Sequence, residues 1–401
     1  MKKSMKTYGC MLFILLMVAV TGHVTADPFA TAFSDKPEHA ILLIIDGLSY
    51  KVWDRLNLPV LTKMIQGGAL VEKNYLTPAA HPHSGAYAEL HSGSIPNPIL
   101  LSGTVFITRE TTYLQDSFYP SKTAAFIANT LAYNSLNRNY HYSYQQEGRD
   151  ADAIRVALKF MEMGKPAFMH IHLQDTGGAG GRSLSAPENV PWRWNIWAEG
   201  SPYRAVAQRA DSLVGEFVTG LEKLGVLDKT VIVVMGDHGQ SDSGWHPLES
   251  MDASITTIVL WGAGVKKNVR IPYSEQIDVT PTICALMGVS PPKTSQGRVI
   301  AETLTHVSGS PSPRKMLMRE MLDLFTEYRK KIAIARYEIE KLSPEKQGNI
   351  FTRFDRAADS FYDISRFTEW SRFHSLEELL EANKKAMEAL NGMLGEIEKT
   401  K

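Results

Sequence analysis

The sequence has little cysteine, no excess charge of either sign and no long apolar segment. Lys+Arg and Asp+Glu number 43 each among 401 residues, so the net charge gives no reason to expect a nucleic-acid partner. The longest leading apolar run holds about ten residues, whereas ~20 are needed to span a bilayer. Cysteine occurs only at Cys10 and Cys284. A packed core rather than cross-links must therefore hold the fold.

The first 26 residues have the pattern of an export signal. Lys2, Lys3 and Lys6 precede the apolar run 11–20, and small residues before Ala26 suit cleavage there. The shortness of the run favours a cleaved signal over an anchor. We expect a secreted protein, periplasmic or exposed at the cell surface. Removal of residues 1–26 would leave Cys284 alone, so no intrachain disulfide is expected.

Residues 27–307 show the alternation of an α/β domain. Continuous apolar runs typical of buried parallel strands occur at 39–45, 122–129, 167–175, 230–239 and 256–264. An amphipathic helix is predicted over 203–224. This alternation predicts a doubly wound, mostly parallel sheet sandwiched by helices, in which polar residues past the strand ends share one crevice.

A linker-like stretch at 308–314, "SGSPSPR", begins a region of different character, 308–401. Apolar residues then recur at alternating spacings of three and four, a heptad seam. Ser375 and Glu378 form a capping-box pattern that opens another helix, to about residue 397. We expect a helical hairpin or small bundle that packs on the main domain or forms a homodimer contact. The seam residues are Met318, Met321, Phe325, Tyr328, Ile332, Ala335, Ile339 and Leu342.

Four residues with metal-ligating side chains lie at the ends of predicted strands, and a fifth follows in the same loop as two of them. Asp46 follows the first strand in "IIDG", and Asp237 and His238 follow a later one in "MGDHGQSDSGWHP", with His246 eight residues beyond. Asp175 precedes a glycine-rich turn in "DTGGAGG". Carboxylate and imidazole are the ligands that zinc and similar divalent ions accept. The set therefore predicts a metal site at the strand ends.

Over residues 38–305 the chain resembles the alkaline phosphatase superfamily, nearest to its phosphodiesterase, sulfatase-like and phosphoethanolamine-transferase branches. The likeness lies in "LLIIDGLS", "GDHGQSDSGWH" and "QIDVTPTICALMGV". It implies that Asp46, Asp237 and His238 hold one divalent ion and that Asp175 and His246 belong to a second. The expected cofactor is a divalent metal, zinc for this ligand set, as one or two ions. The resemblance implies an alkoxide nucleophile that attacks a phosphoryl or sulfuryl group.

The second metal site departs from the family's pattern, which follows its aspartate with a Gly-His pair. In "DTGGAGG" one register places Ala179 where the histidine should be and leaves Asp175 intact. The other register replaces both ligands, with Gly177 and Gly181. Neither register gives a complete site. His170 and His172 on the preceding strand are alternative ligands, although alternating strand histidines more often serve packing and hydrogen bonding.

The nucleophile is sought in "TPAAHPHSGAYAELHSGSIP", residues 77–96. In the family, the nucleophile lies nine residues before a Thr-Gly pair. Ser92–Gly93 occupies the place of that pair in this chain, and counting back nine residues from Ser92 reaches His83. Ser84 lies one position away and has the hydroxyl that a metal can activate, so it is the favoured nucleophile. Thr77 lies six residues too early. The stretch can also be a polar loop and helix start with no nucleophile.

Two functional hypotheses follow. The first is an exported metal-dependent hydrolase or transferase that acts on a small-molecule or envelope phosphate or sulfate ester, with Ser84 as nucleophile. The second is a catalytically degenerate member that binds a ligand or an envelope partner without turnover. The intact "DHG" motif and Asp46 favour the first, and "DTGGAGG" favours the second.

Overall fold

The computed structural model describes residues 27–76, 84–95, 112–247, 250–306 and 313–400. The predicted export signal lies outside this range. No helix within the described residues has the length and apolar character needed to cross a membrane.

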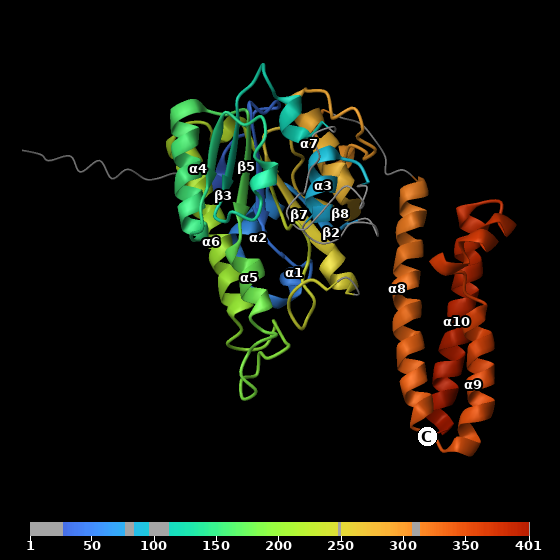
Figure 1. The fold of residues 1–401 in the computed structure, drawn as a ribbon. Helices are drawn as coiled ribbons and strands as arrows, with labels where there is room; N and C mark the ends of the chain where they lie inside the picture. Colours follow the sequence, from blue (N-terminus) through green and yellow to red (C-terminus); the bar gives the residue numbers. More distant parts are fainter. Residues whose placement is uncertain (1–26, 77–83, 96–111, 248–249, 307–312, 401) are drawn as a thin grey trace, which may run out of the picture.

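Eight strands form one sheet in the order β4-β3-β5-β1-β6-β7-β2-β8 (Figure 1). Strand β7 runs antiparallel to β6 and β2, and the other neighbouring pairs are parallel. This confirms the predicted doubly wound, mostly parallel architecture. The strands are β1 (His39–Ile45), β2 (Ala69–Tyr75), β3 (Ala124–Ala128), β4 (Tyr142–Gln145), β5 (Phe168–Leu173), β6 (Thr230–Met235), β7 (Ile255–Gly262) and β8 (Val269–Glu275).

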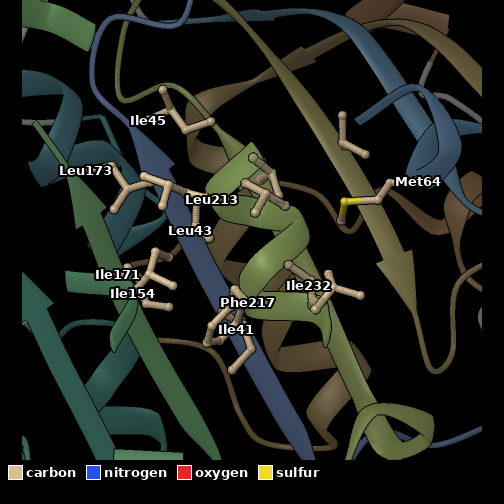
Figure 2. Close-up of a cluster of buried hydrophobic side chains, with 14 of the residues drawn as sticks. Ile41, Leu43, Ile45, Met64, Ile154, Ile171, Leu173, Leu213, Phe217 and Ile232 are labelled. Carbon is tan, nitrogen blue, oxygen red and sulfur yellow. The ribbon is translucent and has the colours of Figure 1, made fainter. Parts of the chain in front are cut away.

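Alternate side chains of the central strands pack into two different cores. Ile41, Leu43 and Ile45 of β1 face one side, where Leu213 and Phe217 of α6 cover them (Figure 2). The intervening residues of β1 face the opposite helical layer. Because both faces are covered, β1 is apolar throughout, as buried parallel strands are. The first layer contains α2 (Pro59–Gln66), α4 (Asp150–Gly164) and α6 (Pro202–Lys223), and the second contains α3 (Ser84–Ser92) and α7 (Val279–Met287).

Cys284 lies on α7 and is buried, as expected of a small apolar side chain. Burial raises the pKa of its thiol to about 11, so the thiol stays protonated and unreactive at neutral pH. Asp278 precedes the same helix, and one of its carboxylate oxygens accepts a hydrogen bond from Arg298 N. Both residues thus serve the fold rather than the crevice.

The chain beyond residue 312 folds into α8 (Pro313–Glu340), α9 (Pro344–Asp359) and α10 (Leu376–Thr400), which run together as a bundle (Figure 1). The predicted seam lies in α8, and Ala335 and Ile339 pack there against Phe354 of α9 and Leu390 of α10. These seam residues thus pack within one chain, and a dimer contact through the bundle stays a prediction. A hydrogen bond of 3.4 Å from Tyr75 Oη to Asp323 Oδ1 joins the bundle to the α/β domain.

Candidate metal centre

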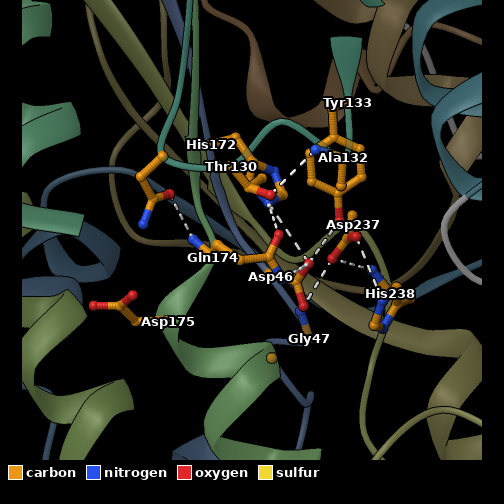
Figure 3. Close-up of polar contacts among 12 residues, drawn as sticks. Asp46, Gly47, Thr130, Ala132, Tyr133, His172, Gln174, Asp175, Asp237 and His238 are labelled. Atoms are coloured by element: carbon orange, nitrogen blue, oxygen red, sulfur yellow. Dashed lines mark hydrogen bonds and ion pairs between the residues drawn. The ribbon is translucent and has the colours of Figure 1, made fainter. Parts of the chain in front are cut away.

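The carboxyl ends of β1 and β6 bring three ligand side chains together. The two strands pair in parallel, with Ile44 opposite Met235, so Asp46 and Asp237 leave the sheet at the same edge. Asp46, Asp237 and His238 each offer a ligand atom, and these atoms all lie within 4.8 Å of one another (Figure 3). All three residues are buried. Within the described residues this is the one such group of metal-ligating side chains.

Hydrogen bonds aim Asp237 and His238 at a common point. Asp237 Oδ1 accepts hydrogen bonds from the backbone N–H groups of Gly47 and His238, each at 3.0 Å. Asp237 Oδ2 accepts no hydrogen bond from the described residues and lies 3.4 Å from His238 Nε2. His238 Nδ1 lies 2.7 Å from the Gly239 carbonyl, which can only accept. In a neutral ring the proton therefore sits on Nδ1 and the lone pair on Nε2, the form that binds a metal.

A ring of polar contacts fixes Asp46. Its Oδ2 accepts hydrogen bonds from Tyr133 Oη at 2.9 Å and Gln174 Nε2 at 3.1 Å. Gln174 Oε1 lies 3.1 Å from His172 Nε2, and His172 Nδ1 lies 2.6 Å from Tyr87 Oη. Because Gln174 Oε1 only accepts, the neutral imidazole donates from Nε2 and accepts the Tyr87 hydroxyl proton at Nδ1. The whole ring orients one carboxylate.

The electrostatics of this ring favour neutral donors. Burial, followed by the charges of Asp46 and Asp237, raises the pKa of Tyr133 well above its usual value. Burial likewise raises the pKa of Tyr87. Both hydroxyls thus remain protonated. Two buried carboxylates this close repel each other, and the Tyr133 hydroxyl and Gln174 amide that donate to Asp46 carry no full charge to offset them. The donor set and its charge fit a divalent cation between Asp46, Asp237 and His238.

The glycine-rich segment forms a short helix, α5 (Asp175–Gly181), rather than the predicted turn. Its glycines permit close approach, because a Cβ at Gly177 would lie 1.6 Å from Asp46 Oδ1. A Cβ at Gly180 would lie 2.3 Å from Gln240 Nε2, and one at Gly181 would lie 2.7 Å from the Trp245 ring. Tertiary packing against these groups outweighs the weak helix propensity of glycine. Protein side chains therefore fill the space beside Gly177, Gly180 and Gly181.

The structure does not bring Asp175 into the three-residue group. Asp175 begins α5 and lies apart from Asp46 in Figure 3. Its backbone N–H donates to Asp150 Oδ1 at 3.0 Å, and its Oδ2 accepts from Asp150 N at 3.4 Å. The role of Asp175 suggested by the geometry is to join α5 to the start of α4.

His246 lies beside the centre, and its ring centroid is 4.4 Å from that of His238. It thus neighbours the first predicted site. His172 belongs to the ring around Asp46. His170 is buried beside Phe126 and His91, and burial lowers the pKa of its imidazole well below the usual value. His170 is therefore a neutral core residue.

The predicted nucleophile stretch is only partly described. Ser84 is the first residue of α3, and its side chain lies outside the described part of the structure, as do Thr77 and His83. Ser92, which stands for the family's threonine, is buried at the end of α3 and donates to the Ala88 carbonyl at 2.6 Å. Sequence reasoning missed Tyr87, Tyr133 and Gln174. Of these, only Gln174 carried a signal, because it is a polar residue near the end of the predicted strand 167–175.

Parts of the chain are similar to known sulfatases and phosphate transferases. Residues 104–289 match the model of the sulfatase family. Mouse arylsulfatase K is 26% identical over 113 residues, which cover 27% of this chain and 20% of the relative. GPI ethanolamine phosphate transferase 1 of Emericella nidulans is 26% identical over 199 residues, which cover 42% of this chain and 20% of the relative. The matched segments thus span about a fifth of these relatives.

Two solved structures share the fold. Phosphonate monoester hydrolase from Silicibacter pomeroyi superposes with a TM-score of 0.55 at 16% identity, covering 69% of this chain and 78% of that one. A protein in the alkaline phosphatase superfamily from Vibrio parahaemolyticus gives 0.50 at 16% identity, covering 68% and 72%. The chain therefore matches the sulfatase family model over residues 104–289 and shares the fold of these two structures, in agreement with the resemblance carried by its motifs.

Proposed function

We propose that the protein is an exported, divalent-metal-dependent hydrolase or transferase of phosphate or sulfate esters. The observation that carries this proposal is the convergence of three buried ligand groups, Asp46, Asp237 and His238, within 4.8 Å. The names of the relatives include a sulfatase, a phosphonate hydrolase and a phosphate transferase. These reactions share attack on a tetrahedral, negatively charged ester group.

Each residue of the centre has a distinct task. Asp46, Asp237 and His238 would hold the ion, and zinc suits this mixed oxygen and nitrogen set. The bound ion would neutralise charge on the ester oxygens and lower the pKa of an attacking hydroxyl. The Tyr133 hydroxyl and Gln174 amide restrain Asp46, and the Gly239 carbonyl keeps the His238 proton away from the ligand nitrogen.

Ser84 is the proposed attacking residue. It begins a nine-residue helix, α3, and the amino end of a helix stabilises negative charge such as that of an alkoxide. As its hydroxyl oxygen bonded to the phosphorus or sulfur, the ester bond would break and the alcohol portion would leave with the proton that Ser84 gives up. The phosphoryl or sulfuryl group would remain on Ser84. Transfer to water or to an acceptor alcohol would then separate a hydrolase from a transferase.

Turnover of three aryl esters tests the proposal: p-nitrophenyl phosphate, bis(p-nitrophenyl) phosphate and p-nitrophenyl sulfate, each with added Zn²⁺, Mn²⁺ or Ca²⁺. We expect release of p-nitrophenol from at least one, a loss of at least ~100-fold in kcat/KM in Asp237→Asn, and no turnover in Ser84→Ala. Asp35→Asn is the matched control, since Asp35 is 82% exposed and precedes β1, at the opposite end of that strand from Asp46. Turnover that survives in Asp237→Asn would refute the proposed centre.

The packing of α5 keeps a second function under consideration. Between Gly177 and Gly181, α5 carries only glycine and alanine and therefore offers no ligand side chain. Gln240 and Trp245 fill the space beside Gly180 and Gly181. A protein that retained the ion but turned over none of the three esters would be a binding protein on the same fold. Metal binding without turnover of any of the three esters would favour this binding function over the enzymatic one.

A further inference from the structure

Two tryptophans in the segments that follow α5 and β6 are exposed and have an unusual backbone. Trp194 is 59% exposed with φ 55°, and Trp245 is 43% exposed with φ 65°. The left-handed region is rare for large side chains, because their Cβ crowds the backbone. An exposed indole also gives folding little apolar burial in return. Both features disfavour stability, and such strain persists where the surroundings enforce it.

Neighbouring segments hold both tryptophans in place. Trp194 N donates to the Ser183 carbonyl at 3.0 Å, and Ser241 N donates to the Trp245 carbonyl at 3.0 Å. Ile196 N donates to the Asp242 carbonyl at 2.9 Å, and Ser183 Oγ donates to the Ser243 carbonyl. The aromatic segment 191–197 and the loop 241–245 are therefore joined by their backbones into one surface.

This surface is continuous with the metal centre. The Trp245 ring packs over Gly181, where a Cβ would lie 2.7 Å from Cε3. The ring stacks on His246 with centroids 4.4 Å apart and an interplanar angle of 26°. His246 in turn lies 4.4 Å from the ring of His238. Two ring contacts thus lead from a proposed metal ligand to an exposed indole.

Polar groups alternate with the aromatic rings on this surface. The Arg193 guanidinium lies 4.4 Å from the centroid of the Trp194 ring and pairs with Glu188 at 2.9 Å, and the next residue, Asn195, is exposed. A lipid chain would favour continuous apolar surface, and an aryl ring offers no hydroxyls to such polar groups. A sugar ring has both an apolar C–H face and a polar edge.

We propose that Trp194 and Trp245 form a subsite for the sugar ring of the ester on which the centre acts. The ring would stack on the indoles while its ester group reached Asp46, Asp237 and His238. The two tryptophans would then determine specificity for the alcohol portion of the ester. This inference rests on the proposed function and deepens it.

Calorimetric titration of the full-length, Zn²⁺-loaded protein tests the subsite. The probes are glucose 6-phosphate and glucose 6-sulfate, with the ethyl and phenyl esters of the same groups for comparison. We expect the hexose ester to bind about tenfold more tightly than the ethyl ester, because stacking on one or two indole rings contributes binding free energy of that order. Trp194→Asn and Trp245→Asn should each remove most of that advantage, since asparagine keeps the left-handed backbone without the ring.

Three further results make the test decisive. Trp245→Phe should restore part of the advantage, and Tyr337→Ala, which removes a 60% exposed aromatic ring from α8, should change nothing. Equal binding of hexose and ethyl esters, or an advantage that survives in both asparagine variants, would overturn the subsite. A preference for the phenyl esters over the hexose esters would overturn the assignment to sugar.

The proposed function and the subsite fail differently. Loss of the function would appear as no Zn²⁺ binding and no turnover, measured separately without any sugar. Loss of the subsite would appear as equal ester affinities while Zn²⁺ remains bound. If none of the esters bound to the loaded protein, the subsite would be rejected.

Discussion

The α/β domain and the carboxyl-terminal bundle bury very different groups. At the carboxyl end of the sheet, Asp46, Asp237, His238 and Tyr133 lie in the interior. The described side chains that the bundle buries are apolar apart from Asn383. Asn383 donates to the Tyr362 carbonyl and accepts from Tyr362 N. A buried ionisable cluster disfavours folding unless it is compensated. Both regions have apolar cores, but the buried ionisable cluster lies in the α/β domain, and the proposed function is therefore expected there and not in the bundle.

The largest effect is expected from the helix that touches Asp46. In Gly177→Ala the new Cβ would lie 1.6 Å from Asp46 Oδ1, so Asp46 or α5 must move. We expect Zn²⁺ affinity to fall at least ~100-fold, with a loss of about 1–3 kcal/mol in the free energy of unfolding from overpacking. Calorimetry and denaturant unfolding would measure the two effects.

Gly178→Ala provides the matched control in the same helix. Nothing lies within 4 Å of a Cβ at this position. The higher helix propensity of alanine should stabilise the protein by up to about 1 kcal/mol and leave Zn²⁺ affinity unchanged. Equal effects of the two substitutions would mean that contact with Asp46 is not what α5 contributes.

A smaller loss is expected from the ring around Asp46. Tyr133→Phe removes the hydroxyl that donates to Asp46 Oδ2 at 2.9 Å. Groups that support metal ligands are typically worth about 10–100-fold in metal affinity, and the lost hydrogen bond about 1 kcal/mol in stability. Tyr273→Phe, which removes a buried hydroxyl bonded to Glu275, should lower stability similarly and leave the affinity unchanged. If the two variants had equal affinities, the ring would be purely structural.

The third effect is a pH dependence of stability at the start of α4. Burial, followed by the charge of Asp175, raises the pKa of Asp150 to about 6, from an ordinary value of 3.8. The folded protein therefore binds this proton more tightly than the unfolded chain. The resulting stabilisation is full below pH 3.8 and is lost as the pH rises through about 6.

Asp150→Asn would isolate this dependence. The amide oxygen can still accept from Asn129 Nδ2 and Asp175 N without carrying a charge. We expect the variant to be more stable than the wild type at pH 7, by about 1–3 kcal/mol, with little difference at pH 4. Urea unfolding at the two pH values would test this, and a pH-independent difference would contradict the account.

The smallest effect should follow removal of the bundle. A chain that ends at Thr305 loses the hydrogen bond between Tyr75 and Asp323, worth about 1 kcal/mol. We expect Zn²⁺ affinity and ester turnover to remain within about twofold. Light scattering of both chains would show whether the bundle also joins two copies. A large loss of metal binding would refute the division of roles between the two regions.

The ligand residues at the strand ends could be predicted from the sequence more readily than the side chains that hydrogen-bond to them. The apolar runs of β1 and β6 located Asp46, Asp237 and His238 because parallel strands end at one edge. β2, β4 and β8 escaped prediction because they carry polar residues such as Glu72, Tyr144 and Arg270. Strands that contain both buried and exposed residues lack the continuous apolar run from which the other strands were predicted.

The ring around Asp46 escaped prediction for a different reason. Its members come from α3, from the chain after β3 and from β5, so no local spacing relates them. The glycines of "DTGGAGG" were interpreted only as lost ligands, whereas their packing against Asp46, Gln240 and Trp245 is a tertiary property. A single sequence does not show which distant segments pack closely against each other.

The most direct test of the central claim is Zn²⁺ titration of the metal-free protein. Wild type should bind one ion per chain through Asp46, Asp237 and His238. His238→Ala and Asp237→Asn should each weaken that binding at least ~100-fold, while His306→Ala, which removes an exposed histidine, should bind as wild type does. Undiminished binding in both of the first two variants would contradict the account.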